Sequence, residues 1–224
     1  MACNATRGPH RDLPSADLTT HGVLSYFSNV FGLTTDETVA VMGAHTLGTA
    51  RRTNSGFNGT GGWVGNINLL NNAYYAGLVG GNAPNDTFVN LFNGPRWDLQ
   101  LVKNSNLQDI PNRFQWIHSN INQSVPNIML NADIGMVRDL TDFLNETTGE
   151  VKCKFACAGS TTCPQNLPPA CPFASQTFNI SVAYKFNNTL WLNDFKAAFN
   201  KMLTNGYSTD AGCNSPPCVL QLLQ

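Results

Sequence analysis

Apolar residues recur at intervals of three and four in several stretches, which predicts a mainly helical chain. Val23 and Phe27 belong to one such series, as on one face of an α-helix. Thr19 or Thr20 can cap the start of this helix, and Gly32 can end it. Similar periodicity predicts further helices over residues 68–79, 133–144 and 189–203.

Shorter apolar or alternating runs predict β-strands between these helices. Residues 88–92 and 97–102 fit two short strands on either side of the turn Asn93-Gly-Pro95. Residues 113–118 fit a strand or a loop. The expected fold class is therefore mainly α with small β-hairpins.

One more helix carries the candidate chemistry. Thr34 and Glu37 have the three-residue spacing of a capping box, so a helix should start here and run towards Gly48. His45 lies near its end, beside Gly43-Ala44, where a flat group could approach the backbone. A histidine in this setting can ligate a metal or haem iron. The alternative is a core histidine bonded to a carbonyl, because a lone histidine is a weak signal.

Composition narrows the class of partner. The chain has 224 residues, enough for one good core, with a net charge of −1 and 12% charged residues. It shows no basic stripe, so nucleic acid is not an expected partner. It also has no apolar run near the roughly 18 residues that span a bilayer, so no membrane partner is expected.

Cysteines and sequons predict a secretory location. Seven cysteines suit an oxidising compartment, and Cys3 should pair with a residue outside this sequence. Seven Asn-x-Ser/Thr sequons point the same way, at Asn4, Asn58, Asn85, Asn122, Asn145, Asn179 and Asn187. The first residues lack a signal peptide, so we expect that it was lost with an N-terminal portion. The alternative is a cytosolic chain with chance sequons.

The cysteines between residues 153 and 171 have two interpretations. Cys153, Cys157, Cys163 and Cys171 lack the paired CxxC knuckles of a zinc site. A disulfide-stapled surface loop is the favoured reading. Cys213 and Cys218 should close the tail as a disulfide, with each other or with the earlier cluster.

The stretch Val39-Ala-Val-Met-Gly-Ala-His-Thr-Leu-Gly48 resembles the proximal-helix signature of plant-type haem peroxidases, particularly their ascorbate and cytochrome c peroxidase branch. Residues 10–17, 51–63, 128–133 and 189–203 resemble other segments of that family in the same order. The resemblance implies the proximal domain of a plant-type haem peroxidase over residues 1–224, with insertions near 80–127 and 146–180, the latter Cys-rich.

The resemblance also implies roles for three residues. His45 would be the axial ligand of the iron of haem b, and Asp133 would accept its imidazole N–H and push electron density onto the iron. Asp133 can also simply favour the N-terminus of a helix. Trp63 would lie beside the imidazole as a radical or electron-relay site; otherwise it is a structural tryptophan closing a glycine-rich loop.

Further correspondences concern the edge of the site and the donor. Arg51 matches a propionate contact or is a solvated surface arginine. Thr46 and Asn66, with Asn71, match a proximal site for Ca²⁺ or K⁺ in which an amide replaces a carboxylate. Asn54 stands where ascorbate-using relatives have an arginine, so ascorbate is a doubtful donor.

The groups that cleave peroxide are not found in the sequence. Relatives carry Arg-x-x-x-His, whose histidine transfers the proton and whose arginine stabilises charge. Arg113 and His118 are five residues apart and follow the proximal helix, so they do not match. The expected function is haem-dependent reduction of hydrogen peroxide with oxidation of a small-molecule donor, in a truncated form with impaired activity. The alternative is a non-catalytic, secreted, disulfide-bonded glycoprotein.

Overall fold

The computed structural model describes residues 13–58, 61–79, 97–104, 106, 108–118, 127–153 and 170–205. Its helices are α1 (Thr20–Phe31), α2 (Thr35–Met42), the 3₁₀-helix η1 (Gly43–Thr46), α3 (Arg52–Ser55), α4 (Ala73–Val79), α5 (Asn131–Ile134), α6 (Phe178–Phe186) and α7 (Asn188–Thr204). Its strands are β1 (Trp97–Lys103), β2 (Asp109–His118), β3 (Ile128–Met129), β4 (Leu144–Asn145) and β5 (Glu150–Val151). The predicted fold class, mainly helical with small antiparallel sheets, is confirmed.

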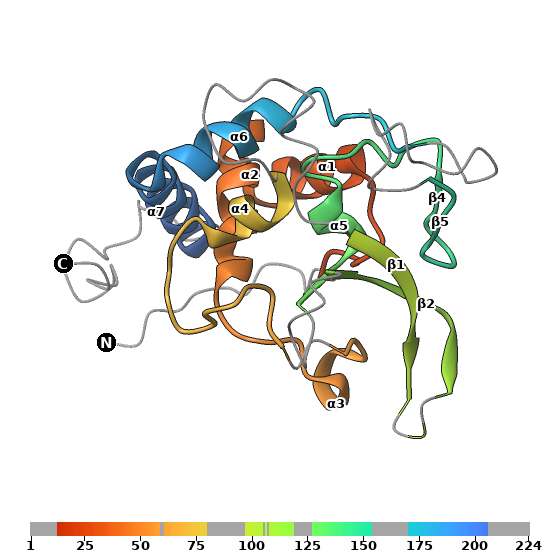
Figure 1. Ribbon diagram of the computed structural model, residues 1–224. Coiled ribbons are helices and arrows are strands. Elements are labelled where there is room, and N and C mark those ends of the chain that lie inside the picture. The colour runs from red at the N-terminus through yellow and green to blue at the C-terminus, as the bar shows by residue number, and fades with distance from the viewer. Residues whose placement is uncertain are drawn as a thin grey trace, which may run out of the picture.

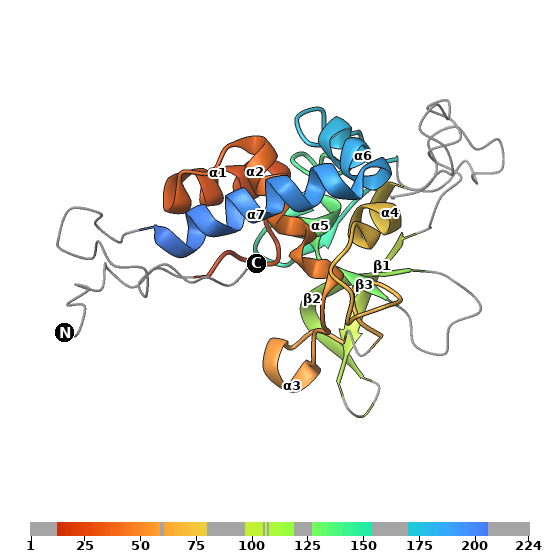
Figure 2. The same ribbon diagram turned by 90° about the vertical axis from the view of Figure 1, so that its left-hand side faces the viewer.

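The larger helices pack around α2. Figures 1 and 2 show α7 lying along α2, with α1 beside them and with α4 and α6 on the neighbouring side. The middle of α2 is fully buried from Thr38 to Ala40. A helix buried on most of its surface depends on its neighbours for its exact shape, which matters for the residues that follow it.

A three-stranded antiparallel sheet projects from the helices (Figure 1). β1 pairs with β2 from Trp97 opposite His118, and the register shifts between Leu101 and Lys103. β2 then pairs with β3, with Trp116 opposite Met129. β3 leads directly into α5, which carries Asp133.

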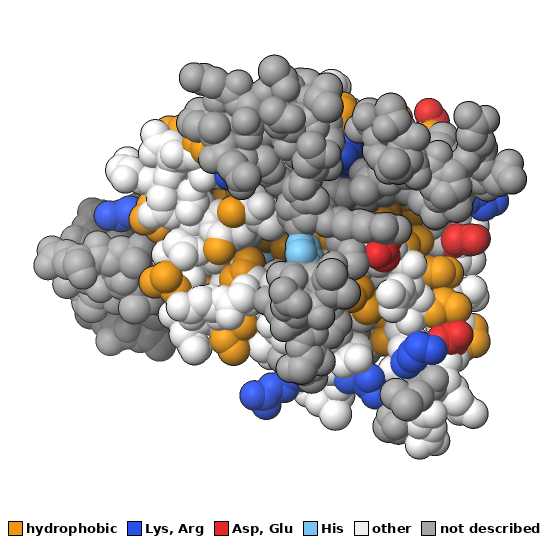
Figure 3. All heavy atoms as spheres, in the orientation of Figure 1, with side chains coloured by type: hydrophobic (Ala, Val, Ile, Leu, Met, Phe, Trp, Pro, Cys, Tyr) orange, Lys and Arg blue, Asp and Glu red, His pale blue; other side chains and the backbone are white. Residues whose placement is uncertain are grey.

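In Figure 3, charged side chains lie mainly towards the lower and right edges of the face shown, and hydrophobic ones are spread over it.

Two predicted helices are shorter in the structure. The helix predicted over 68–79 starts only at Ala73, because Asn71 Oδ1 accepts the Ala73 N–H at 3.0 Å and Asn72 is tied to the carbonyls of Tyr184 and Lys185. The helix predicted over 133–144 ends at Ile134. The chain then runs through turns, so the buried residues 137, 140 and 144 do not share one helix.

The expectation of a disulfide in the Cys-rich segment is confirmed. Cys153 and Cys171 form a disulfide that closes a separation of 18 residues. The other cysteines, the strand predicted over 88–92 and the sequons at Asn4, Asn85 and Asn122 lie outside the described residues. In the part of the chain that is described, no helix is long and apolar enough to cross a membrane.

Candidate functional site

His45 is positioned by the end of α2. The helix begins with the predicted capping box, in which Thr34 Oγ1 accepts the Glu37 N–H and Glu37 Oε2 accepts the Thr34 N–H. It does not continue as an α-helix to Gly48 as predicted, but ends at Met42 and tightens into η1. His45 lies in this tightened turn.

Asp133 meets His45 across 88 residues of sequence. Nδ1 of His45 and Oδ1 of Asp133 are 2.8 Å apart. The same carboxylate accepts the Tyr74 hydroxyl at 3.0 Å and the Leu130 backbone N–H at 2.9 Å. Asp133 therefore contacts both the backbone at the start of α5 and the imidazole of His45. Its role in tuning an iron ligand stays a prediction.

The tautomer of His45 follows from this geometry. A carboxylate only accepts hydrogen bonds, so Nδ1 carries a proton and donates a hydrogen bond to Asp133. The other nitrogen, Nε2, has no hydrogen-bond partner among the described residues. The Asp133 side chain is fully buried, whereas 34% of the His45 side chain is exposed. The imidazole is thus held by a buried carboxylate on its Nδ1 side, and part of the ring remains exposed.

The charge of the pair is set by two opposing effects. Burial disfavours the protonated imidazole and lowers the pKa of His45, but the negative charge of Asp133 and its hydrogen bond outweigh this and raise it above its ordinary value. Burial, followed by the Asp133 charge, raises the pKa of Tyr74 well above its ordinary value. The Tyr74 hydroxyl therefore stays protonated as a donor to the carboxylate.

Trp63 covers one face of the imidazole. Its ring is stacked on that of His45, with centroids 3.9 Å apart and planes 4° from parallel. The preceding Gly62 has a φ of 82°, a left-handed conformation that favours glycine, and its carbonyl accepts the Ile128 N–H. This bond fixes the Trp63 loop to β3, the strand that leads to Asp133.

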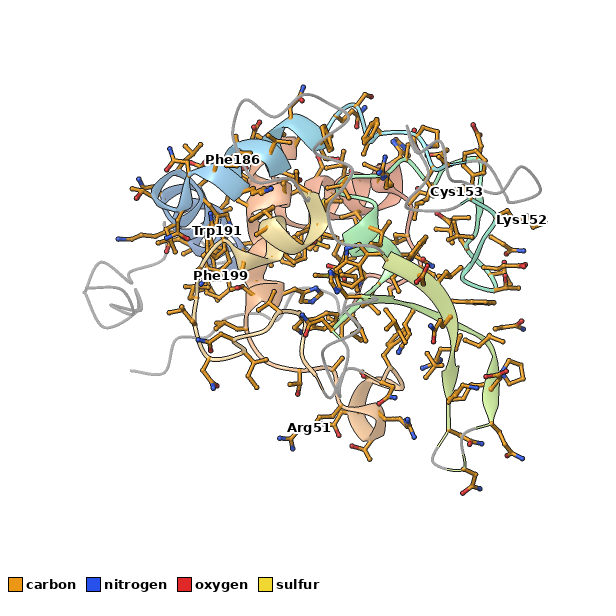
Figure 4. All side chains as sticks on the ribbon, in the orientation of Figure 1. Arg51, Lys152, Cys153, Phe186, Trp191 and Phe199 are labelled. Carbon is orange, nitrogen blue, oxygen red and sulfur yellow. A yellow bond between two sulfur atoms is a disulfide. The ribbon has the colours of Figure 1, made fainter. Side chains whose placement is uncertain are left out.

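The residues predicted at the edge of the site are not all brought together. The buried Thr46 hydroxyl donates to Asn71 Oδ1 at 3.1 Å, whereas Asn66 Oδ1 accepts the Asn68 N–H. The cation site proposed at Thr46 and Asn66 stays a prediction. Arg51 is exposed beside α3 and points outward in Figure 4. Its contact with a propionate also stays a prediction.

The space beside Gly43 is occupied by protein. A Cβ on Gly43 would lie 2.6 Å from both Trp191 Nε1 and Tyr75 Oη. Two buried aromatic side chains therefore fill the space next to Gly43. The approach of a flat group beside Ala44 and His45 stays a prediction. Among the ring nitrogens of His45, Nε2 is the one that no hydrogen bond within the described residues occupies.

Sequence reasoning missed two partners of Asp133. Tyr74 lies in the helix predicted over residues 68–79, where it had no assigned role, and the Leu130 N–H carries no side-chain signal. For Tyr74 a signal exists in the adjacent pair Tyr74-Tyr75, two hydroxyls in an otherwise apolar segment that need buried partners. The pattern does not tell which buried groups they find.

The potential metal ligands among the described residues are those that a haem iron needs from a protein, a single imidazole. Within the described ranges, no group of three or more His, Cys, Asp or Glu side chains could hold a metal ion. One imidazole suffices as the protein ligand where a porphyrin supplies the other ligands of the iron. His45 offers such an imidazole, with its second nitrogen anchored by a carboxylate as is usual for metal-bound histidine.

No protein-family model matches the chain. Over 73 residues the chain is 36% identical to the cytosolic L-ascorbate peroxidase 2 of Oryza sativa subsp. japonica. The match covers 33% of this chain and 28% of that relative, so it spans little more than a quarter of the relative's length.

The comparison corrects one expectation and supports another. The predicted secretory location is contradicted, because the matched relative is cytosolic by name, and we withdraw it. The match supports a peroxidase-like relationship for this chain.

Proposed function

We propose that the chain binds haem b through Nε2 of His45 and acts in the reduction of hydrogen peroxide, with oxidation of a small-molecule electron donor. The observation that carries the proposal is the 2.8 Å bond between His45 and the buried Asp133. In the neutral imidazole it fixes the tautomer in which Nε2 has a free electron pair for iron. The match to a peroxidase over part of the chain adds independent support.

Haem, when bound, supplies the iron at which peroxide is reduced, and the protein residues tune that iron. Asp133 accepts a hydrogen bond from Nδ1–H and makes the imidazole a stronger electron donor. Tyr74 and the Leu130 N–H hold the carboxylate in place, so its charge cannot turn away from His45. Trp63 shields the imidazole face from water, and its indole, in contact with the ligand, is suited to relay an electron.

The proposal also states which part of a peroxidase domain the chain represents and how active it should be. We propose that residues 1–224 correspond to the proximal half of a haem peroxidase domain, with insertions near residues 80–127 and 146–180. The sequence has no Arg-x-x-x-His motif, so this chain alone lacks the usual groups that protonate and polarise peroxide. We expect the purified chain with haemin to oxidise a dye little faster than haemin does.

Titration with haemin tests the proposal. The native chain should bind one haemin with a shifted Soret band, and His45→Ala should lose that band. The matched control is His21→Ala, which removes the histidine that lies exposed on α1 beside Ser25. Free imidazole should restore the spectrum of His45→Gly, which separates loss of the ligand from loss of the fold. Equal haemin affinity and spectra for the native chain and His45→Ala would reject His45 as the ligand.

A further inference from the structure

Two aromatic side chains bond to the backbone of the last turn of α2. The Tyr75 hydroxyl donates to the carbonyl oxygen of Val39 at 2.6 Å, and Trp191 Nε1 donates to that of Ala40 at 3.0 Å. Both rings are fully buried; Tyr75 comes from α4 and Trp191 from α7, where Figure 4 labels it. In a continuing α-helix these two carbonyls would accept the N–H groups of residues 43 and 44.

Gly43 is what lets these groups reach the backbone. Its φ is −61°, which any residue can adopt, so the glycine is not needed for its conformation. It is needed for space, since a Cβ would lie 2.6 Å from both the Tyr75 oxygen and the Trp191 nitrogen. Glycine inside a helix lowers stability relative to alanine. Here the missing Cβ leaves room for two side-chain hydrogen-bond donors.

The helix changes its hydrogen bonding at this point. The backbone N–H groups at the Gly43 cap bond to the carbonyls of Ala40 and Val41, and the Leu47 N–H bonds to Ala44. These shorter bonds define η1, which carries His45. A side chain inserted into the helical ladder is a recognised cause of such a break.

The change of helix type determines where the imidazole points. An α-helix turns about 100° per residue and a 3₁₀-helix about 120°, so over the three residues from 43 to 45 the two differ by about 60°. A rotation of that size would carry the His45 ring away from Asp133. The 2.8 Å bond between them is made from the tightened turn.

We propose that Tyr75 and Trp191 are positioning residues, whose hydrogen bonds to Val39 and Ala40 hold η1 in the form that places His45 against Asp133. The importance of this placement for peroxide chemistry rests on the proposed function. The placement itself does not, because it concerns two side chains of the protein without haem.

A merely structural role for the two rings is the competing explanation. Tyr75 also packs against Tyr184, and Trp191 against Phe195. Variants that keep the ring and remove the donor separate the two explanations. Tyr75→Phe has a matched control in Tyr184→Phe, a buried tyrosine that donates to the Asp194 side chain and to the Asp36 carbonyl in the first turn of α2, away from η1. Trp191→Phe has a matched control in Trp97→Phe, a buried tryptophan that donates to the Gly77 carbonyl.

The test is the solvent-exchange rate of the His45 Nδ1 proton, measured by NMR on the full chain without haem. The resonance is assigned by its loss in His45→Ala. Tyr75→Phe and Trp191→Phe should each speed exchange about tenfold, the effect of losing one hydrogen bond, while their controls keep the native rate. Rates in the two variants no faster than in their controls would overturn the proposal, as would a native protein with no protected Nδ1 proton.

The outcomes are separable from those of haem binding. If Trp191→Phe fails to fold, Tyr75→Phe decides the question, because it removes a single oxygen atom. A chain that fails to bind haemin but loses Nδ1 protection in Tyr75→Phe would reject the proposed function and keep the positioning role. The reverse result would reject the positioning role alone.

Discussion

The rings of His45 and Trp63 lie parallel, 3.9 Å apart between centroids, although one follows α2 and the other belongs to a glycine-rich loop. With one imidazole face covered by Trp63 and Nδ1 bonded to Asp133, Nε2 is the ring nitrogen left to bind a ligand. The Nε2 electron pair points in that plane, so stacking and hydrogen bonding together favour one direction of coordination.

Tyr74→Phe should strengthen the bond between His45 and Asp133. The variant removes one of three donors to the carboxylate and leaves more of its charge for Nδ1. The Nδ1 proton should move downfield, while loss of a hydrogen bond to a charged group lowers the free energy of unfolding by about 1.5–3 kcal/mol. NMR and urea denaturation measure the two effects. An unchanged or upfield shift would mean that Tyr74 does not compete for the carboxylate.

Asn131→Ala should destabilise the region around α5. The buried Asn131 side chain accepts from Trp116 Nε1 at 2.8 Å and donates to Asp17 and to the Gly149 carbonyl at 2.9 Å each. Its removal leaves buried polar groups unpaired, so the free energy of unfolding should fall by about 2–3 kcal/mol. Asn193→Ala, on the exposed side of α7, is the control and should change it by less than about 0.5 kcal/mol. Similar urea midpoints for the two variants would contradict this account.

The capping box of α2 should make stability depend on acid pH. A hydrogen bond from Lys201, then the Thr34 backbone N–H, hold the pKa of Glu37 below its ordinary value against a small effect of burial. A lowered pKa means that folding favours the carboxylate, so the stabilisation is present above the unfolded pKa of about 4.3 and is lost as pH falls below it.

Glu37→Gln should therefore flatten the stability profile between about pH 5 and pH 3. The effect should not exceed about 1 kcal/mol, because the Glu37 side chain is partly exposed. Glu150→Gln, at an exposed position in β5, is the control. Thermal unfolding across this pH range measures the difference, and parallel profiles for the native chain and Glu37→Gln would remove the assigned role of Glu37.

Local signals in the sequence were enough for several elements. The Thr34 and Glu37 spacing gave the start of α2, Thr19 and Gly32 gave both ends of α1, and the apolar periodicity of residues 189–203 gave α7 nearly to the residue. These signals are contained in the segments themselves. The pairing of His45 with Asp133 came instead from the resemblance to a family, because no local pattern relates two residues 88 positions apart.

The errors occur where distant residues decide the local structure. α2 ends at Met42, where the side chains of Tyr75 and Trp191 donate to the carbonyls of Val39 and Ala40. α6 was not predicted, since its buried positions include Ser181 and Tyr184, whose hydroxyls bond to Met136 and Asp194. Polar residues on a buried face hide the apolar periodicity from which helices are recognised.

The frequency of the iron–imidazole stretch in the reduced, haem-loaded chain is the most direct measurement of the central claim, that His45 binds haem iron and is polarised by Asp133. Resonance Raman spectroscopy should detect this band in the native chain and find it at lower frequency in Asp133→Asn, whose amide carries no charge. Asp194→Asn should leave it unchanged, because Asp194 bonds to Tyr184 instead. Absence of the band in the native chain, or the same frequency in Asp133→Asn, would contradict the claim.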